Sequence, residues 1–116
     1  MPRILIVDVE ESIRITIKEF LTDEGHEVQI AEDANTALEL LKNNNFDVVV
    51  TDIILPRMSG VKLLKAIRDA AEHVQVVMIT GEPTIDTASE SLRLGAFDYL
   101  AKPVTKEAIV RTVNNA

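Results

Sequence analysis

The sequence predicts an α/β domain in which a parallel β-sheet is covered by helices on both faces. Short apolar runs rich in Val and Ile alternate about five times with longer amphipathic segments, a pattern typical of βαβ units. The connections between them are short, which favours crossovers onto one parallel sheet. The 116 residues are enough for one domain with its own core, and no repeat or change of composition divides them.

The third predicted strand is the clearest, because Val48, Val49 and Val50 form an unbroken β-branched run before Thr51 and Asp52. A run without polar alternation is typical of a strand that is buried on both faces. The five strands are expected at residues 3–8, 27–31, 47–52, 75–80 and 98–101.

The amphipathic segments predict the helices. In the first, Ile13, Ile17 and Leu21 fall on one helical face, although residues 13–17 also alternate as a strand would. Gly25 supplies a stop for this helix. The five helices are expected at residues 11–24, 34–43, 59–71, 84–94 and 106–115.

Three polar side chains are suited to cap helix N-termini. Asp33, Thr84 and Thr105 stand directly before the second, fourth and fifth helical segments. Their side-chain oxygens can accept hydrogen bonds from backbone N–H groups that the first turn leaves free. These caps sharpen the expected helix starts.

Composition limits the classes of function. A hydrophobic fraction of 47% supports a packed core, and a net charge of −7 disfavours direct binding of nucleic acid. The absence of cysteine excludes disulfides and thiolate metal sites. No apolar run approaches the roughly 20 residues that a membrane span needs, so a cytoplasmic protein without membrane contact is expected. His26 and His73 lie in predicted turns and are expected to be exposed and not to bind metal.

Polar side chains end three of the predicted strands. Asp8, Asp52 and Thr80 follow the first, third and fourth apolar runs, and a loop with Pro56 and Gly60 follows Asp52. In open α/β sheets the functional groups gather at the carboxyl ends of the strands. The sequence therefore predicts an acidic site at this edge of the sheet.

Four segments carry a resemblance to a known family. They are Ile4-Leu5-Ile6-Val7-Asp8, the spacing Asp52-x-x-x-Pro56-x-x-x-Gly60, the pair Thr80-Gly81, and Gly95-Ala96-Phe97-Asp98-Tyr99-Leu100-Ala101-Lys102-Pro103. In this order the chain resembles, over essentially its whole length, the receiver domain of two-component response regulators. The resemblance implies a flavodoxin-like (βα)5 fold, a doubly wound five-stranded parallel sheet of order 2-1-3-4-5. Residues 80–88 also resemble receivers of sigma-54-dependent, nitrogen-regulation-type transcription activators.

The resemblance implies that Asp52 accepts a phosphoryl group from a sensor histidine kinase or a phosphotransfer protein. Lys102 would bind a phosphoryl oxygen as a point charge, and Thr80 would donate its hydroxyl to the same group. Thr80 and Tyr99 would then switch the surface of the fourth helix and fifth strand for an output domain, a partner protein or a homodimer. Such a domain assists its own phosphorylation and dephosphorylation and is not a classical turnover enzyme. Pro103 would follow a cis peptide bond.

The resemblance also implies a Mg²⁺ site formed by Asp8, Asp52 and the backbone carbonyl of Ile54. Such oxygen ligands suit Mg²⁺, which can bridge the acceptor to a phosphoryl oxygen. The chain departs from the family at Val9, where a second acidic ligand is usual. Because one charged ligand is lost, we expect Mg²⁺ to bind more weakly than in the family by about 1–3 kcal/mol. Glu10 is a candidate replacement ligand, and its competing role is to place charge at a helix N-terminus.

Val9 leaves two interpretations of function open. The retained Asp52, Thr80 and Lys102 favour a phosphorylatable receiver with weakened metal binding. The alternative is a degenerate receiver, which acts without phosphorylation as a protein-interaction or dimerisation module. Ile54 further predicts slow loss of the phosphoryl group, because its side chain cannot orient a hydrolytic water.

Other classes fit the same pattern less well. A haloacid-dehalogenase-like phosphatase needs a second Asp two residues after the acceptor, where this chain has Ile54. A nucleotide-binding protein needs a glycine-rich loop after the first strand, and residues 8–11 contain no glycine. Acidic residues at that strand end would also repel a flavin phosphate. Residues 1–116 are expected to form one receiver domain, and the abrupt end at Ala116 is compatible with a longer natural chain that carries an output domain.

Overall fold

The predicted parallel sheet is present in the computed structural model, which describes residues 2–71 and 73–116. The order of the strands within these residues is β2-β1-β3-β4-β5, and every neighbouring pair runs parallel. The expected fold class and strand order are therefore confirmed. The strands are β1 (Arg3–Val7), β2 (Glu27–Ala31), β3 (Val48–Asp52), β4 (Gln75–Thr80) and β5 (Asp98–Ala101).

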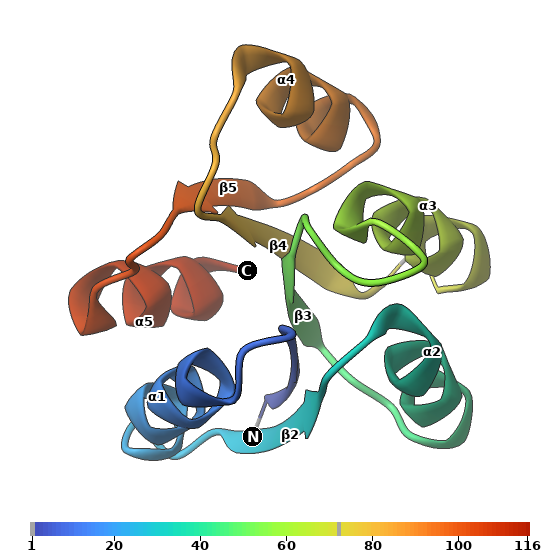
Figure 1. Cartoon of the computed structure of the whole chain (residues 1–116). Coiled ribbons are helices and arrows are strands. Elements are labelled where there is room, and N and C mark those ends of the chain that lie inside the picture. The colour runs from blue at the N-terminus through green and yellow to red at the C-terminus, as the bar shows by residue number, and fades with distance from the viewer. Residues whose placement is uncertain (1, 72) are drawn as a thin grey trace.

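The helices cover the sheet on both faces (Figure 1), with α1 and α5 on one face and α2, α3 and α4 on the other. This arrangement follows from the position of β1 inside the sheet, since the chain crosses to opposite sides on either side of it. The helices are α1 (Glu11–Thr22), α2 (Ala34–Asn43), α3 (Gly60–Ala70), α4 (Ile85–Arg93) and α5 (Lys106–Asn115).

The inner strands bury both of their faces. On β1, Leu5 and Val7 pack against the α2–α3 side, while Ile4 and Ile6 pack against the α1–α5 side. Side chains on a strand alternate between the two faces, so a strand between two helical layers needs apolar residues at every position. This requirement explains the unbroken apolar run of Val48–Val50, which divides between the same two cores.

The observed helix ends explain why the helix boundaries predicted from the sequence are nearly correct. Asp33, Ser59, Thr84 and Thr105 each stand at an N-cap, and each side chain accepts a hydrogen bond from a backbone N–H of the first turn. The first helix ends at Thr22, two residues earlier than predicted, because a turn precedes Gly25, which has φ of 86°. The ambiguous residues 13–17 are helical.

Candidate functional site

Two carboxylates and one ammonium group meet at the carboxyl edge of the sheet. Lys102 Nζ lies 2.8 Å from Asp8 Oδ2 and 2.9 Å from Asp52 Oδ2. Asp8 is fully buried and Asp52 is 5% exposed. The three side chains come from segments far apart in the sequence, so the structure brings together the charged residues that the sequence predicted for this edge.

Backbone pairing at the ends of the strands fixes these positions. The Asp8 N–H donates to the Ala31 carbonyl, and the Lys102 N–H donates to the Thr80 carbonyl at 2.7 Å. Lys102 stands directly after β5, where the following peptide bond to Pro103 is cis, as expected. The parallel register thus places one end of each strand at the same edge.

Each carboxylate is oriented by a backbone N–H from its own loop. The Glu10 N–H donates to Asp8 Oδ1 at 2.9 Å, and the Ile54 N–H donates to Asp52 Oδ1 at 3.2 Å. The second oxygen of Asp52 accepts a hydrogen bond from Lys102. Asp8 Oδ2 has close charge contact with Lys102 but receives no hydrogen bond of suitable angle. A buried carboxylate oxygen without a directional partner is suited to bind a cation.

Lys102 is held in its charged form by this arrangement. Partial burial alone would lower the pKa of its ammonium group, but the close contacts with the Asp8 and Asp52 carboxylates and their charge attraction outweigh it, and the net pKa is raised above 10.5. An opposite charge within hydrogen-bond distance stabilises the ionised form. Lys102 is therefore a fixed positive charge between two acids.

Gly60 explains the spacing of the loop after the acceptor. A Cβ at this position would collide with the Asp52 carbonyl oxygen and would lie 2.8 Å from Ile53 Cα. The Gly60 N–H also donates to the Ile53 carbonyl at 2.7 Å. Only glycine lets the start of α3 approach the backbone of the acceptor this closely.

The predicted switch residues lie beside the charged cluster. Thr80 ends β4, is 1% exposed, and its Oγ1 accepts a hydrogen bond from the Glu82 N–H at 3.0 Å. Tyr99 lies in the neighbouring strand and is half-buried, and its hydroxyl contacts Thr87 Oγ1 at 2.7 Å. Its hydroxyl therefore points to the N-terminal end of α4.

The remaining predicted residues surround the site at the surface. Val9 is 51% exposed and Ile54 is 55% exposed. Glu10 stands at the N-cap of α1 without a side-chain capping bond and is exposed. Within residues 2–71 and 73–116, no group of three or more His, Cys, Asp or Glu side chains converges as a metal site would. Among the residues that the structure describes, no third acidic side chain therefore completes a metal site with these two carboxylates.

Arg14 is a residue that sequence reasoning missed. Its Nη1 donates to the Asp8 carbonyl at 2.8 Å and to the Val9 carbonyl at 3.2 Å. It therefore ties the loop after β1 to the first helix. Its place one turn into a helix gives no signal of this role, since an arginine there usually extends into solvent.

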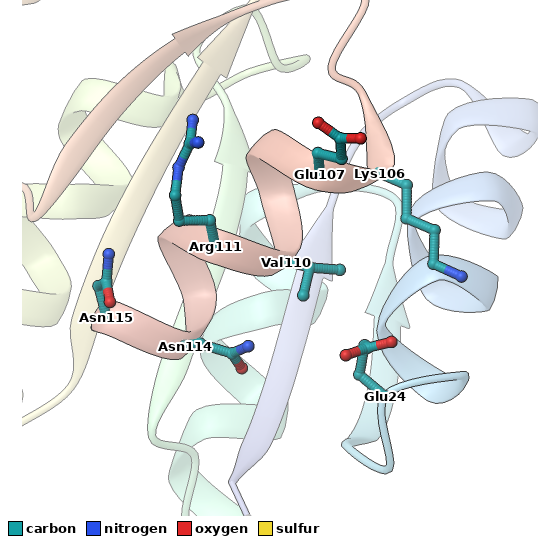
Figure 2. A pocket seen from close by; sticks show the side chains of 7 residues that line it. All are labelled: Glu24, Lys106, Glu107, Val110, Arg111, Asn114 and Asn115. Carbon is teal, nitrogen blue, oxygen red and sulfur yellow. The ribbon is translucent and has the colours of Figure 1, made fainter.

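A surface hollow of about 600 Å³ beside α5 lies apart from this cluster (Figure 2). Its lining side chains come from α5 and from Glu24, and they carry charges of both signs. None of the charged residues at the sheet edge lines it. Close to this region, the prediction that His26 is exposed was wrong, because the ring is half-buried and Nε2 lies 3.0 Å from Asn114 Oδ1.

The chain matches a known family over nearly its whole length. The profile of the response regulator receiver domain matches residues 4–114. The chain is 38% identical over 114 residues to the regulatory protein AtoC of Escherichia coli (strain K12), an alignment that covers 98% of this chain and 25% of AtoC. The chain therefore belongs to the response regulator receiver domain family, whose members are signalling domains of two-component systems rather than classical enzymes.

Solved structures agree with this assignment. A receiver domain from Clostridium thermocellum has a TM-score of 0.94 at 35% identity, covering 99% of this chain and 93% of that chain. The beryllofluoride-activated NtrC4 receiver domain dimer has a TM-score of 0.95 at 32% identity, covering 99% and 95%. The second likeness agrees with the narrower resemblance to nitrogen-regulation-type receivers. No helix in the described ranges has the length and apolar character that a membrane crossing requires.

Proposed function

We propose that this receiver domain accepts a phosphoryl group on Asp52 and thereby switches the surface formed by α4 and β5. The observation that carries the proposal is the position of the Asp52 carboxylate. It stands at the end of a buried strand, with one oxygen held by the Ile54 N–H and the other by Lys102. A fixed carboxylate beside a fixed cation is what attack on an anionic phosphoryl group requires.

In the proposed reaction an Asp52 oxygen forms a bond to phosphorus while the bond from phosphorus to the donor breaks. The donor is a sensor histidine kinase or a phosphotransfer protein, and its leaving group takes the electron pair of the broken bond. Lys102 balances negative charge on the phosphoryl oxygens. Because Thr80 Oγ1 already accepts from Glu82, its own hydrogen is free to donate to the phosphoryl group.

Mg²⁺ would be held by Asp8, Asp52 and the backbone carbonyl of Ile54. The buried Asp8 Oδ2 that lacks a directional hydrogen bond supports this ligand set, since Mg²⁺ is commonly bound through one or two carboxylates and phosphate. When bound, the ion supplies positive charge at the phosphoryl oxygens. Val9 provides no ligand oxygen from its side chain, so we expect affinity lower by about 1–3 kcal/mol than with an acid there. Glu10 remains a candidate ligand, but its N-cap position favours a role at the helix start.

Phosphoryl loss is proposed to be slow. Ile54, two residues beyond the acceptor, is 55% exposed at the edge of the site. Its apolar side chain offers no group to orient a hydrolytic water. The expected result is a phosphoprotein half-life well beyond seconds, measured by intact mass after removal of the donor.

A groove next to Lys102 supports docking of the phosphodonor protein. It encloses about 310 Å³ between α1 and the segment after β5, and apolar side chains such as Ile13 and Val104 line it. Output would pass through α4 and β5, to a partner or to a second copy as in the NtrC4 receiver dimer. Because the chain spans 25% of AtoC, we propose that residues 1–116 act as the receiver of a longer regulator.

A degenerate receiver is the second candidate function. Val9 at the metal position, together with the exposed apolar side chains of Ile85, Leu92 and Phe97, favours a docking surface that does not need phosphorylation. Binding of a partner or of a second copy would then be unchanged in Asp52→Asn. Binding that depends on phosphorylation would eliminate this candidate.

The testing experiment incubates the domain with a small acyl phosphate, with and without Mg²⁺, and measures phosphoryl addition by intact mass. Mg²⁺-dependent addition that is lost in Asp52→Asn is the expected result. Addition only after Val9→Asp would show that position 9 alone silences the site. Absence of addition in both proteins would overturn the phosphoacceptor function and leave the docking function.

A further inference from the structure

The fourth helix has little apolar burial to stabilise it. Ser91 is the only residue of α4 that is buried, whereas Ile85 is 85% exposed and Leu92 is 54% exposed. A helix of nine residues is marginal without tertiary packing. The hydrogen bonds at its N-terminus therefore contribute a large share of what holds it in place.

Those hydrogen bonds depart from the usual capping pattern. Thr84 is the N-cap, and its Oγ1 accepts from the Thr87 N–H at 3.1 Å. In a capping box the side chain at the third helical position accepts from the N-cap N–H in return. Here the third position is Thr87, and the Thr84 N–H is instead accepted by the Tyr99 hydroxyl oxygen at 3.3 Å. Tyr99 thus takes the part of the missing glutamate or glutamine.

The donors and acceptors around Tyr99 form a closed set. Because the Tyr99 oxygen accepts from Thr84, its own hydrogen is available to Thr87 Oγ1, which lies 2.7 Å away. The Thr87 hydroxyl can then donate to the Thr84 carbonyl at 3.3 Å or to Thr84 Oγ1 at 2.8 Å. The hydroxyls of Tyr99 and Thr87 each donate one hydrogen bond and accept another, so removal of either hydroxyl weakens the hydrogen bonds that remain.

We propose that the Tyr99 hydroxyl forms part of the N-terminal cap of α4, and that Thr87 is the positioning residue that holds this hydroxyl at the cap. The cap is formed in the unmodified domain and does not depend on the proposed phosphoacceptor function, whereas its regulatory use rests on that function. Movement of Thr80 towards a phosphoryl group frees Tyr99 to turn. The Thr84 N–H then loses its acceptor, and the first turn of α4 loosens.

The first test measures amide hydrogen exchange by NMR in the unphosphorylated domain. We expect exchange at the Thr84, Thr87 and Ala88 amides to be about three- to tenfold faster in Tyr99→Phe and in Thr87→Val, the factor for loss of one hydrogen bond. Thr87→Ser retains the hydroxyl and should behave as the parent protein. The double variant should match the single ones, because either change breaks the same set.

The matched control is Thr105→Val, which removes the equivalent N-cap of α5 away from Tyr99. It should speed exchange at the start of α5 and leave α4 unchanged. Normal exchange at α4 in Tyr99→Phe, or effects of the two changes that simply add, would overturn the proposal.

The second test uses Tyr99 as an optical probe, since the chain has one tyrosine and no tryptophan. Its near-ultraviolet circular dichroism should change when acyl phosphate is added, and Thr87→Val should show part of that change before addition. Phosphoryl addition, measured by mass, should stay within about twofold of the parent. A parent-like spectrum in unmodified Thr87→Val would count against the cap. If no phosphoryl group is added to the parent, the proposed function fails, while the exchange measurement still decides the cap.

Discussion

The helices that precede and follow β4 in the chain, α3 and α4, are held in opposite ways. The third helix buries Gly60, Leu63, Leu64 and Ile67, and its first residue packs against the backbone of Asp52. The fourth helix buries one residue and depends on hydrogen bonds at its N-terminus. Elements with few buried apolar contacts open at low free energy. The reacting carboxylate of Asp52 thus lies next to the well-packed helix α3, whereas the surface that is proposed to respond is formed by the poorly packed helix α4.

The largest expected difference comes from deleting one leucine from each helix. Leu64→Ala in α3 removes a fully buried side chain and should lower the free energy of unfolding by about 2–5 kcal/mol. Leu92→Ala in α4 removes a side chain that is 54% exposed and should change it by less than about 0.5 kcal/mol. Urea denaturation of both variants measures the contrast. Equal losses would contradict the comparison between the two helices.

A methyl group at the start of α3 should disturb both stability and the acceptor. Gly60→Ala places Cβ against the Asp52 carbonyl oxygen, an overpacking that we expect to cost about 3 kcal/mol. Phosphoryl addition to the folded fraction should also slow, because the backbone that orients Asp52 must shift. Ser89→Ala on exposed α4 is the control and should leave both measurements near the parent values. Parent-like addition in Gly60→Ala would show that the close approach does not position the acceptor.

Alkaline pH should weaken the charge interaction of Lys102 with Asp8 and Asp52, and so lower the stability of the domain. The raised pKa of Lys102 means that its charged form is stabilised on folding, so this contribution is complete below pH 10.5 and is lost as pH rises through the folded-state value. Unfolding in Mg²⁺-free buffer should become easier across that window. Lys102→Met should lack this part of the pH dependence, whereas Lys106→Met, at an exposed ion pair, should retain it.

The smallest expected effect concerns the loop between the acceptor and α3. Arg57 has φ of 69°, a left-handed conformation that arginine adopts at a cost and asparagine adopts more readily. Arg57→Asn should therefore stabilise the domain by about 0.5–1 kcal/mol. Thermal unfolding measures the gain. Lys65→Asn, which also replaces a cationic side chain by asparagine but in helical α3, should instead destabilise slightly, and a gain there would remove the conformational explanation.

Strand placement was predictable because local pattern and global topology coincide. The apolar runs end at Asp8, Asp52 and Thr80, and the parallel sheet brings these ends together. The role of Lys102 at the site was implied only by family resemblance, since a lysine after a short strand carries no signal by itself, and its contact with both acids was not predicted. What the residues alone indicated was the edge at which the site would lie.

Contacts between distant segments were not predictable from the sequence. Thr84 was expected as a cap, but its N–H bond to Tyr99 spans 15 residues, and the bond between His26 and Asn114 spans 88. Neither leaves a periodic pattern, because it depends on how helices pack on the sheet. Arg14 escaped notice for a different reason, since its acceptors are nearby backbone carbonyls, which any residue provides.

The pairing of α1 with α5 on one face of the sheet has a consequence for synthesis on the ribosome. The core on this face includes Ile4 and Ile17 from the start of the chain and Ile109 and Val113 from α5. Chains emerge N-terminus first, so this side of β1 and β3 stays partly uncovered until α5 has left the exit tunnel. A nascent chain whose α5 is still inside the exit tunnel should consequently expose an apolar surface on this face that chaperones recognise, although the elements of the other face have already emerged.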